Sequence, residues 1–148
     1  MQSIKIEPIG IIHSPYTSTK DIPSQGYIRE NVEAVIEINK KFKPAMKDIE
    51  GFSHLIVLFY FHKSKQTHMR GHPSWEDKEH GVFALRSPHR PNHIGMTVIK
   101  VKEVRDNKIV FTHVDMLDKT PVIDIKPYVG EFENIKNPKF GWLEKHRG

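Results

Sequence analysis

The chain has 148 residues, of which 37% are hydrophobic and 28% charged, and its formal net charge is +5. This length suits one folded domain, and the composition is too apolar for a disordered chain. No cysteine is present, which excludes disulfides, thiolate metal sites and a cysteine nucleophile. No apolar run approaches the ~18 residues of a membrane span and the N-terminus lacks the pattern of a secretory signal, so we expect a cytoplasmic protein with no membrane partner. The modest positive charge is compatible with a polyanionic partner such as RNA.

The apolar periodicity, taken in chain order, is mostly that of β-strands. Residues 32–38 combine alternation with β-branched side chains, and residues 55–61 are continuously apolar, as in a strand covered on both faces. Residues 96–104 alternate imperfectly and lead to Asp106 and Asn107, which predict the turn of a hairpin.

The remaining elements complete a mainly β pattern. Residues 121–128 alternate as a further strand. Helix signals are weak: one short candidate follows Pro44 and stops at Gly51, and another short turn begins at Asn137-Pro138. Many short strands with one or two short helices predict a small antiparallel β-barrel, closed or partly open, because closure removes sheet edges. We expect a single domain over residues 1–148, with residues 129–148 as a C-terminal tail.

The stretch "LRSPHRPNHIG", residues 85–95, is stiffened and polar immediately before a predicted strand. Pro88 and Pro91 fix φ, and Gly95 permits a close approach of another group. Arg86 and Arg90 are forked donors suited to a carboxylate or a phosphate. The residues alone favour a stiff surface loop whose arginines pair with local acids, and leave open a loop that holds a ligand.

Three other polar groups are candidates for binding. Asp115 and Asp118 flank an apolar pair after a strand, where carboxylates suit ribose hydroxyls or an ammonium group, or form simple Asx turns. Residues 21–27 form a loop punctuated by Pro and Gly. His62 and Lys63 end an apolar strand, either as donors facing a cavity mouth or as a strand-ending polar pair.

The histidines do not predict a metal site. His68 and His72, like His89 and His93, are four residues apart, a spacing that aligns two imidazoles only on a helix. Glycines and prolines beside both pairs oppose helices there. The dinucleotide-binding and P-loop patterns are also missing from the sequence.

Four stretches taken together resemble one family. "IGIIHSPY" (residues 9–16), "GFSHLIVLFYFH" (51–62), "GVFALRSPHRPNHIGMTV" (81–98) and "DMLDKTPVIDIKPYV" (115–129) occur in the order and spacing of the TsaA-like family. Its characterised members are S-adenosylmethionine-dependent tRNA (adenine-N6)-methyltransferases. The resemblance covers nearly the whole chain up to Val129. The chain has His93 where the family pattern has Pro, and Lys119 where it has Gly.

The resemblance implies a mostly antiparallel β-barrel, a homodimer, and a site for S-adenosyl-L-methionine near the dimer interface. The loop before the strand at 96–104 would then be one wall of that site. The positions that match the family's cofactor contacts are Pro23, Ser24, Gln25, His62, Lys63, Arg86, Met96, Asp115, Met116, Leu117 and Asp118.

The reaction that the resemblance implies is methyl transfer to N6 of N6-threonylcarbamoyladenosine, next to the anticodon of tRNA. Arg90, Lys100 and Lys102 are candidates for holding tRNA phosphates. The catalytic residue stays unassigned, although the chemistry of an imidazole makes His62 a candidate base. Three alternatives remain: a module that binds S-adenosylmethionine without transferring its methyl group, a methyltransferase with a non-tRNA acceptor, and a metal-dependent hydrolase built on the histidines.

Overall fold

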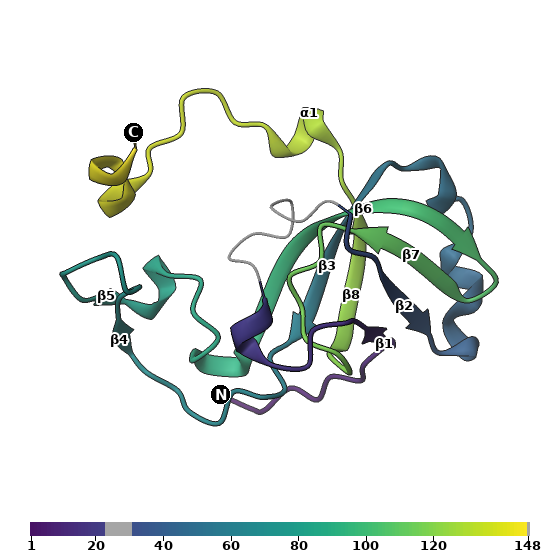
Figure 1. Cartoon of the computed structure of the whole chain (residues 1–148), viewed down its shortest axis with the longest axis horizontal. Coiled ribbons are helices and arrows are strands. Elements are labelled where there is room, and N and C mark those ends of the chain that lie inside the picture. The colour runs from purple at the N-terminus through teal and green to yellow at the C-terminus, as the bar shows by residue number, and fades with distance from the viewer. Residues whose placement is uncertain (23–30, 148) are drawn as a thin grey trace.

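A computed structural model of the chain describes residues 1–22 and 31–147. Six strands form a closed barrel in the order β1-β2-β7-β6-β3-β8, and every neighbouring pair is antiparallel (Figure 1). This confirms the predicted fold class. The barrel strands are β1 (Gly10–His13), β2 (Ala34–Ile38), β3 (His54–Tyr60), β6 (Ile94–Arg105), β7 (Lys108–Thr112) and β8 (Pro121–Pro127).

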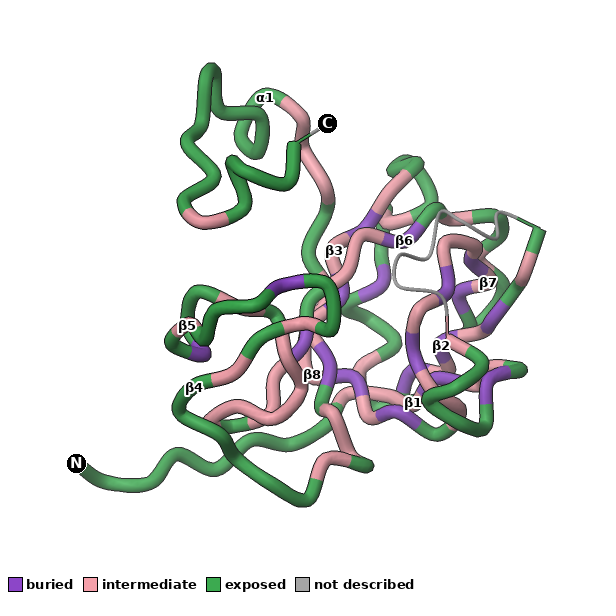
Figure 2. The backbone as a smooth tube through the Cα atoms, turned by 60° about the vertical axis from the view of Figure 1, so that its left-hand side comes forward, coloured by how far each residue is buried: buried purple, intermediate pink, exposed green. Residues whose placement is uncertain are grey.

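Alternate residues of the strands fill the barrel. In β3 the side chains of Leu55, Val57 and Phe59 are buried, and the residues between them are half-buried or exposed. The continuously apolar sequence of β3 therefore covers two different surfaces, the barrel core and a partly open outer face. In Figure 2 the buried residues accordingly gather in the barrel, whereas the chain beyond it is mostly exposed.

The hairpin predicted at Asp106 and Asn107 is confirmed. Asp106 has a φ of 53° in the turn between β6 and β7. Asn107 is buried, and its side-chain Nδ2 donates to the carbonyl of Ile38 over 2.7 Å. The turn is thus tied to the end of β2, which explains why a polar residue is buried here.

The helical elements are short and mostly 3-10 turns. In place of one short helix after Pro44, the structure has two such turns: η3 (Lys40–Met46), which begins before Pro44, and η4 (Ile49–Gly51), which ends at Gly51 as predicted. The turn predicted at Asn137-Pro138 is wrong, because Asn137 has a φ of 54° rather than the extended backbone of an N-cap. Helical turns instead occur on either side, at α1 (Gly130–Glu133) and η7 (Gly141–His146). None of the helices in the described part of the chain is long and apolar enough to cross a membrane.

The segment between β3 and β6 projects from the barrel and carries a small hairpin of β4 (Arg70–Gly71) and β5 (His80–Gly81), followed by η5 (Val82–Ala84) and η6 (Pro91–His93). The chain after β8 leaves the barrel and reaches this hairpin (Figure 1). A further 3-10 turn, η1 (Thr19–Asp21), follows β1.

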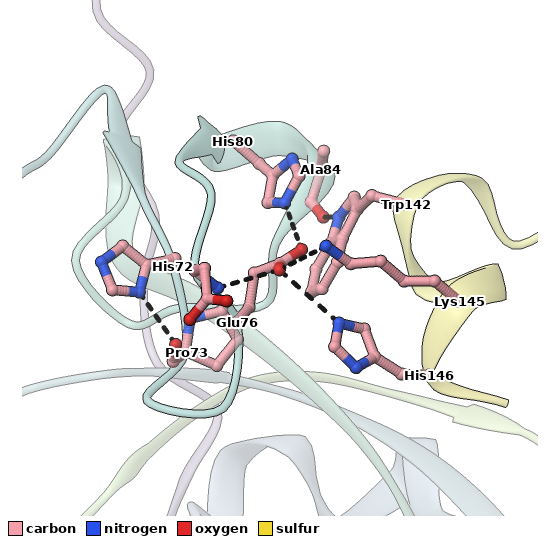
Figure 3. A network of polar contacts seen from close by, with 9 residues as sticks. His72, Pro73, Glu76, His80, Ala84, Trp142, Lys145 and His146 are labelled. Carbon is pink, nitrogen blue, oxygen red and sulfur yellow. Dashed lines mark hydrogen bonds and ion pairs between the residues drawn. The ribbon is translucent and has the colours of Figure 1, made fainter. Parts of the chain in front are cut away.

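The contact between the C-terminal tail and the hairpin centres on the buried carboxylate of Glu76 (Figure 3). It lies 2.7 Å from Lys145 Nζ and 2.7 Å from His80 Nε2. The Trp142 indole stacks on His80 at 4.3 Å between ring centroids and donates to the carbonyl of Ala84 over 2.8 Å. We call this group the Glu76 clamp.

Candidate functional site

A cavity of about 1030 Å³ lies against β3 and β6 and is closed on one side by the loop between β7 and β8. It brings together side chains from the end of β3, the start of β6, the loop before β6 and the loop before β8. The predicted cofactor residues that line it are His62, Lys63, Arg86, Met96, Asp115, Met116 and Leu117. Pro23, Ser24 and Gln25 lie outside the described residues, although Ile22, immediately before them, lines the cavity.

The antiparallel register of β3 and β6 explains why these side chains meet. Met96 is the partner of Leu58, and Gly95 is the partner of Phe59, so the start of β6 lies beside the end of β3. A Cβ on Gly95 would lie 2.5 Å from Cζ of Phe59 and 2.8 Å from Cζ of Phe61. The predicted close approach at Gly95 is therefore confirmed, because only a glycine leaves room for these two cavity-lining rings.

Most of the polar side chains in the loop before β6 form hydrogen bonds that stabilise the conformation of this loop. Arg90 Nη1 donates to the carbonyls of Leu85 (2.7 Å) and Ser87 (3.4 Å). His89 Nδ1 lies 2.8 Å from Ser64 Oγ, which ties the loop to the end of β3. Arg86 is exposed and lines the cavity. The stiff loop thus forms one wall and presents one guanidinium to the cavity.

His93 gives this loop a backbone that the proline of the family pattern cannot adopt. Its φ is 50°, and its backbone N–H donates to the carbonyl of Arg90 over 3.1 Å. Proline has a φ near −65° and no N–H. The His93 ring adds a hydrogen bond from Nδ1 to the carbonyl of Pro88 over 2.9 Å. The departure from the family pattern therefore changes the local conformation but keeps the loop closed.

Asp115 is the electrostatically unusual group of the cavity. Thr97 Oγ1 donates to its Oδ2 over 3.1 Å, while its buried Oδ1 has no hydrogen-bond partner among the described residues. Burial raises the pKa of Asp115 from 3.8 to about 6. A buried oxygen without a partner is costly, so Asp115 is suited to accept a hydrogen bond from a ligand, such as an ammonium group or a ribose hydroxyl.

Asp118 has a different environment from Asp115. Its Oδ1 accepts from the backbone N–H of Ser14 over 3.0 Å, and its own N–H donates to the carbonyl of Tyr16 over 2.7 Å. It does not belong to the cavity lining. Next to it, Lys119 has a φ of 68° and donates its N–H to Ile12. Asp118 and Lys119 fasten the loop that carries Asp115 to the chain at β1.

His62, which follows the end of β3, provides a largely neutral imidazole in the cavity. Burial and the charge of Lys63 lower the pKa of His62, and its buried Nε2 has no hydrogen-bond partner in the described part of the chain. A neutral ring with a free nitrogen can accept a proton or a hydrogen bond from a ligand in the cavity.

The structure does not gather the three residues predicted to contact nucleic acid. Arg90 lies before β6, and its Nη1 donates to the carbonyl of Leu85 within the same loop. Lys102 forms an ion pair with Glu33. Lys100 is exposed in the second half of β6, opposite His54.

The cavity-lining residues that were missed from the sequence include four with polar or aromatic side chains: His54, Thr97, His113 and Tyr128. Three of them, His54, Thr97 and Tyr128, fall inside the stretches that carry the family resemblance, which is the signal that could have found them. Among residues 1–22 and 31–147, no three His, Asp or Glu side chains are arranged to hold a metal ion.

Comparisons with known proteins agree with this geometry. A family model described as the tRNA-methyltransferase O N-terminal domain matches residues 11–134. A "probable S-adenosyl-L-methionine-binding protein" of Pyrococcus abyssi is 45% identical over 94% of this chain and 76% of its own length. The human "tRNA (adenine(37)-N6)-methyltransferase" is 35% identical over 88% of this chain, which spans 31% of that protein.

The fold is also similar to solved structures. The crystal structure of TrmO from Pseudomonas aeruginosa superposes with a TM-score of 0.81 and 32% identity, over 95% of this chain and 62% of that one. The chain therefore spans less than two thirds of that structure, and about a third of the human methyltransferase.

Proposed function

The chain belongs to the family of the tRNA-methyltransferase O N-terminal domain, and on that premise we propose that it binds S-adenosylmethionine and transfers its methyl group to N6 of an adenosine in tRNA. The observation that carries this proposal is the cavity between β3, β6 and the loop before β8. Residues from three separate parts of the chain, all matched to the family's cofactor contacts, line that one space.

The residues present fit this cofactor. Arg86 and Lys63 offer positive charge for its carboxylate, and Asp115 offers a partner-free oxygen for its ammonium group or a ribose hydroxyl. Met96, Phe59 and Phe61 provide apolar surface for its adenine. The chemistry that S-adenosylmethionine supplies is an electrophilic methyl group on a sulfonium ion.

The chain's contribution to the reaction is positioning and proton transfer. Displacement at a methyl group requires the acceptor amine to be held in line, which a stiff cavity wall favours. The amine must also lose a proton. His62, a neutral imidazole, and Asp115, with its pKa of about 6, are two proton acceptors that line the cavity among the residues matched to the cofactor site.

We further propose that the acceptor is N6-threonylcarbamoyladenosine next to the anticodon, and that the protein acts in the cytoplasm as a homodimer with the cavity near the interface. The family resemblance supports these points. Light scattering of the purified protein measures the dimer, and mass spectrometry of digested tRNA identifies the methylated nucleoside.

The experiment that tests cofactor binding is calorimetric titration of S-adenosylmethionine into the wild type and Arg86→Ala. We expect saturable binding by the wild type and at least a roughly tenfold loss in the variant, since a charged contact to the carboxylate disappears. Arg105→Ala is the matched control, because Arg105 pairs with Glu103 in an exposed position outside the cavity. Equal affinity in wild type and Arg86→Ala would contradict the assigned site.

The second candidate is a module that binds S-adenosylmethionine without catalysis. It is favoured by two relatives named as binding proteins of which this chain covers 76% and 93%, whereas it covers only 31–32% of the mammalian methyltransferases; a third relative with such a name is longer, and this chain covers 39% of it. Binding without methylation of any tRNA would support the module. Methylation of another nucleic acid would support a different acceptor, and activity lost to a chelator would support the hydrolase.

A further inference from the structure

Three aromatic rings line the cavity at the end away from His62. His54 begins β3, His113 follows β7, and Tyr128 follows β8. The His54 ring centroid lies 6.2 Å from that of His113 and 6.3 Å from that of Tyr128, with tilted planes. None of the three matches a cofactor contact of the family pattern. We call them the ring cluster.

The backbone at this end is held in an unfavourable conformation. His113 has a φ of 63°, in the left-handed region that residues with a Cβ rarely adopt. The Tyr128 N–H donates to the carbonyl of His54 over 3.2 Å, which fixes two of the rings relative to each other. Unfavourable backbone conformations of this kind gather at binding sites.

The cavity has room for a second ligand beside the cofactor. Its volume of about 1030 Å³ is at the upper end of pockets for one drug-sized molecule. The length of β3, which begins at His54 of the ring cluster and ends at Tyr60, two residues before His62, is roughly 20 Å. Thr97 lies on β6 between Met96 and Lys100, and its hydrogen bond to Asp115 holds that carboxylate, from the loop between β7 and β8, beside this part of the strand.

The charges at this end suit a nucleotide. Burial, together with the charges of His113 and Lys100, lowers the pKa of His54, so its ring is neutral at physiological pH. Lys100, the partner of His54 across the β3–β6 ladder, is exposed beside the rings. The neutral His54 ring and the Tyr128 ring, beside an exposed cation, match a base with its phosphate.

We propose that His54, His113 and Tyr128 form the subsite for the target base of a single-stranded RNA acceptor, with Lys100 at the adjoining phosphate. This inference rests on the proposed function and adds the place of the acceptor. A base splayed out of an RNA loop stacks on the rings, and its exocyclic amine then points toward the middle of the cavity, where Asp115 lies.

The test compares Tyr128→Leu with Tyr60→Leu, a matched control at the opposite end of β3 that does not line the cavity. The probe is an anticodon stem-loop RNA with 2-aminopurine in place of the target adenine, added with S-adenosylhomocysteine. In the wild type and Tyr60→Leu we expect binding with fluorescence quenched by stacking. Tyr128→Leu should bind the RNA at least roughly tenfold more weakly and keep its affinity for S-adenosylmethionine within about twofold.

Two results would overturn the proposal: an equal loss of S-adenosylmethionine affinity in Tyr128→Leu, which would make the rings a cofactor subsite, or unchanged RNA binding with unchanged quenching. Absence of methylation by the wild type would count against the proposed function alone, because the fluorescence experiment measures base binding directly.

A measurement on the wild type covers the case in which Tyr128→Leu fails to fold. The imidazole resonances of His54 and His113 should shift when the stem-loop is added to the protein saturated with S-adenosylhomocysteine. His72, which is exposed and outside the cavity, serves as the internal control. Shifts absent from His54 and His113, or equal at His72, would refute the subsite.

Discussion

A buried carboxylate, Glu76, and a half-buried one, Asp115, have opposite properties in this molecule. Glu76, in the clamp between the hairpin and the tail, is bound by Lys145, His80 and the backbone N–H of Asp77. These contacts, with Lys145 first, hold the pKa of Glu76 far below its usual range despite burial. Asp115 has one hydrogen bond and one oxygen without a partner, and burial raises its pKa to about 6.

The difference separates a structural site from a binding site. Desolvation opposes the charged form of both groups, and only their partners differ. The carboxylate of Glu76 is satisfied within the chain and fastens the tail. Asp115 is left incomplete in a cavity, which is the arrangement expected where a ligand supplies the missing partner.

Gly95→Ala is expected to have the largest effect, and to act on the cavity and the adjoining barrel core but not on the Glu76 clamp. The new Cβ would collide with the rings of Phe59 and Phe61, so we expect a loss of about 2–3 kcal/mol in the free energy of unfolding, together with weaker cofactor binding. Urea unfolding and calorimetry measure both. Gly81→Ala is the control, because nothing lies within 4 Å of its Cβ position. Equal stabilities for the two variants would contradict the crowding at Gly95.

Glu76→Gln is expected to release the tail and leave the cavity intact. Removing the charge leaves Lys145 without its ion pair, so hydrogen exchange of residues 141–146 should accelerate roughly tenfold while the amides of β3 keep their protection. Since the folded pKa of Glu76 is depressed, the clamp holds above its ordinary pKa of 4.5 and weakens as the pH falls below that value.

The control for the clamp is Glu79→Gln, an exposed carboxylate in the same hairpin. Unchanged exchange of the tail in Glu76→Gln, or a loss of affinity for S-adenosylmethionine, would show that the clamp and the cavity are not the independent regions described above.

Asp115→Asn tests the other carboxylate, for which the pH dependence of stability is opposite to that of Glu76. The folded pKa of Asp115 is raised, so its contribution to stability is fully present below 3.8 and is lost as the pH rises through about 6. The uncharged variant should therefore be more stable than the wild type at pH 8, by about 1–2 kcal/mol, and equal to it near pH 4. Its affinity for S-adenosylmethionine should fall.

Denaturant unfolding at the two pH values measures this difference. Asp124→Asn is the control, because Asp124 pairs with Lys126 and is partly exposed. A stability gain for Asp115→Asn that is the same at pH 4 and pH 8 would exclude burial of the charge as its cause.

The barrel could be predicted because most of its strands and its hairpin turn are recognisable from short stretches of sequence. Alternation marked β2, β6 and β8, and Asp106 and Asn107 marked the hairpin turn. β1 was missed, since four residues are too few to show a period. The contact of Trp142 and Lys145 with the hairpin was not predictable either, because it joins segments far apart in the sequence.

The residues of the candidate site divide in the same way, into those that sequence motifs identify and those that only the folded structure brings together. Arg86, His62 and Asp115 were identified through family motifs, and the structure places them around one cavity. The rings of His54, His113 and Tyr128 come from the start of β3 and the ends of β7 and β8, which the sheet order β7-β6-β3-β8 brings together. No pattern within a single segment reports such a meeting, so the ring cluster became visible only in three dimensions.

Lys119→Gly is expected to have the smallest effect. It tests how the loop that carries Asp115, on the cavity side of the comparison, is held in place. Asn92, His93, His113 and Lys119 all have positive φ in the loops next to the cavity. At a φ of 68° a glycine avoids the cost of a Cβ, so the variant should gain about 0.5–1 kcal/mol in free energy of unfolding. Lys119→Ala removes the same side chain but keeps the Cβ, and should gain nothing. If both variants gain the same stability, the backbone of this loop is unstrained. The loop that carries Asp115 is then held only by its hydrogen bonds, of which the one from the Lys119 N–H to the Ile12 carbonyl is an example.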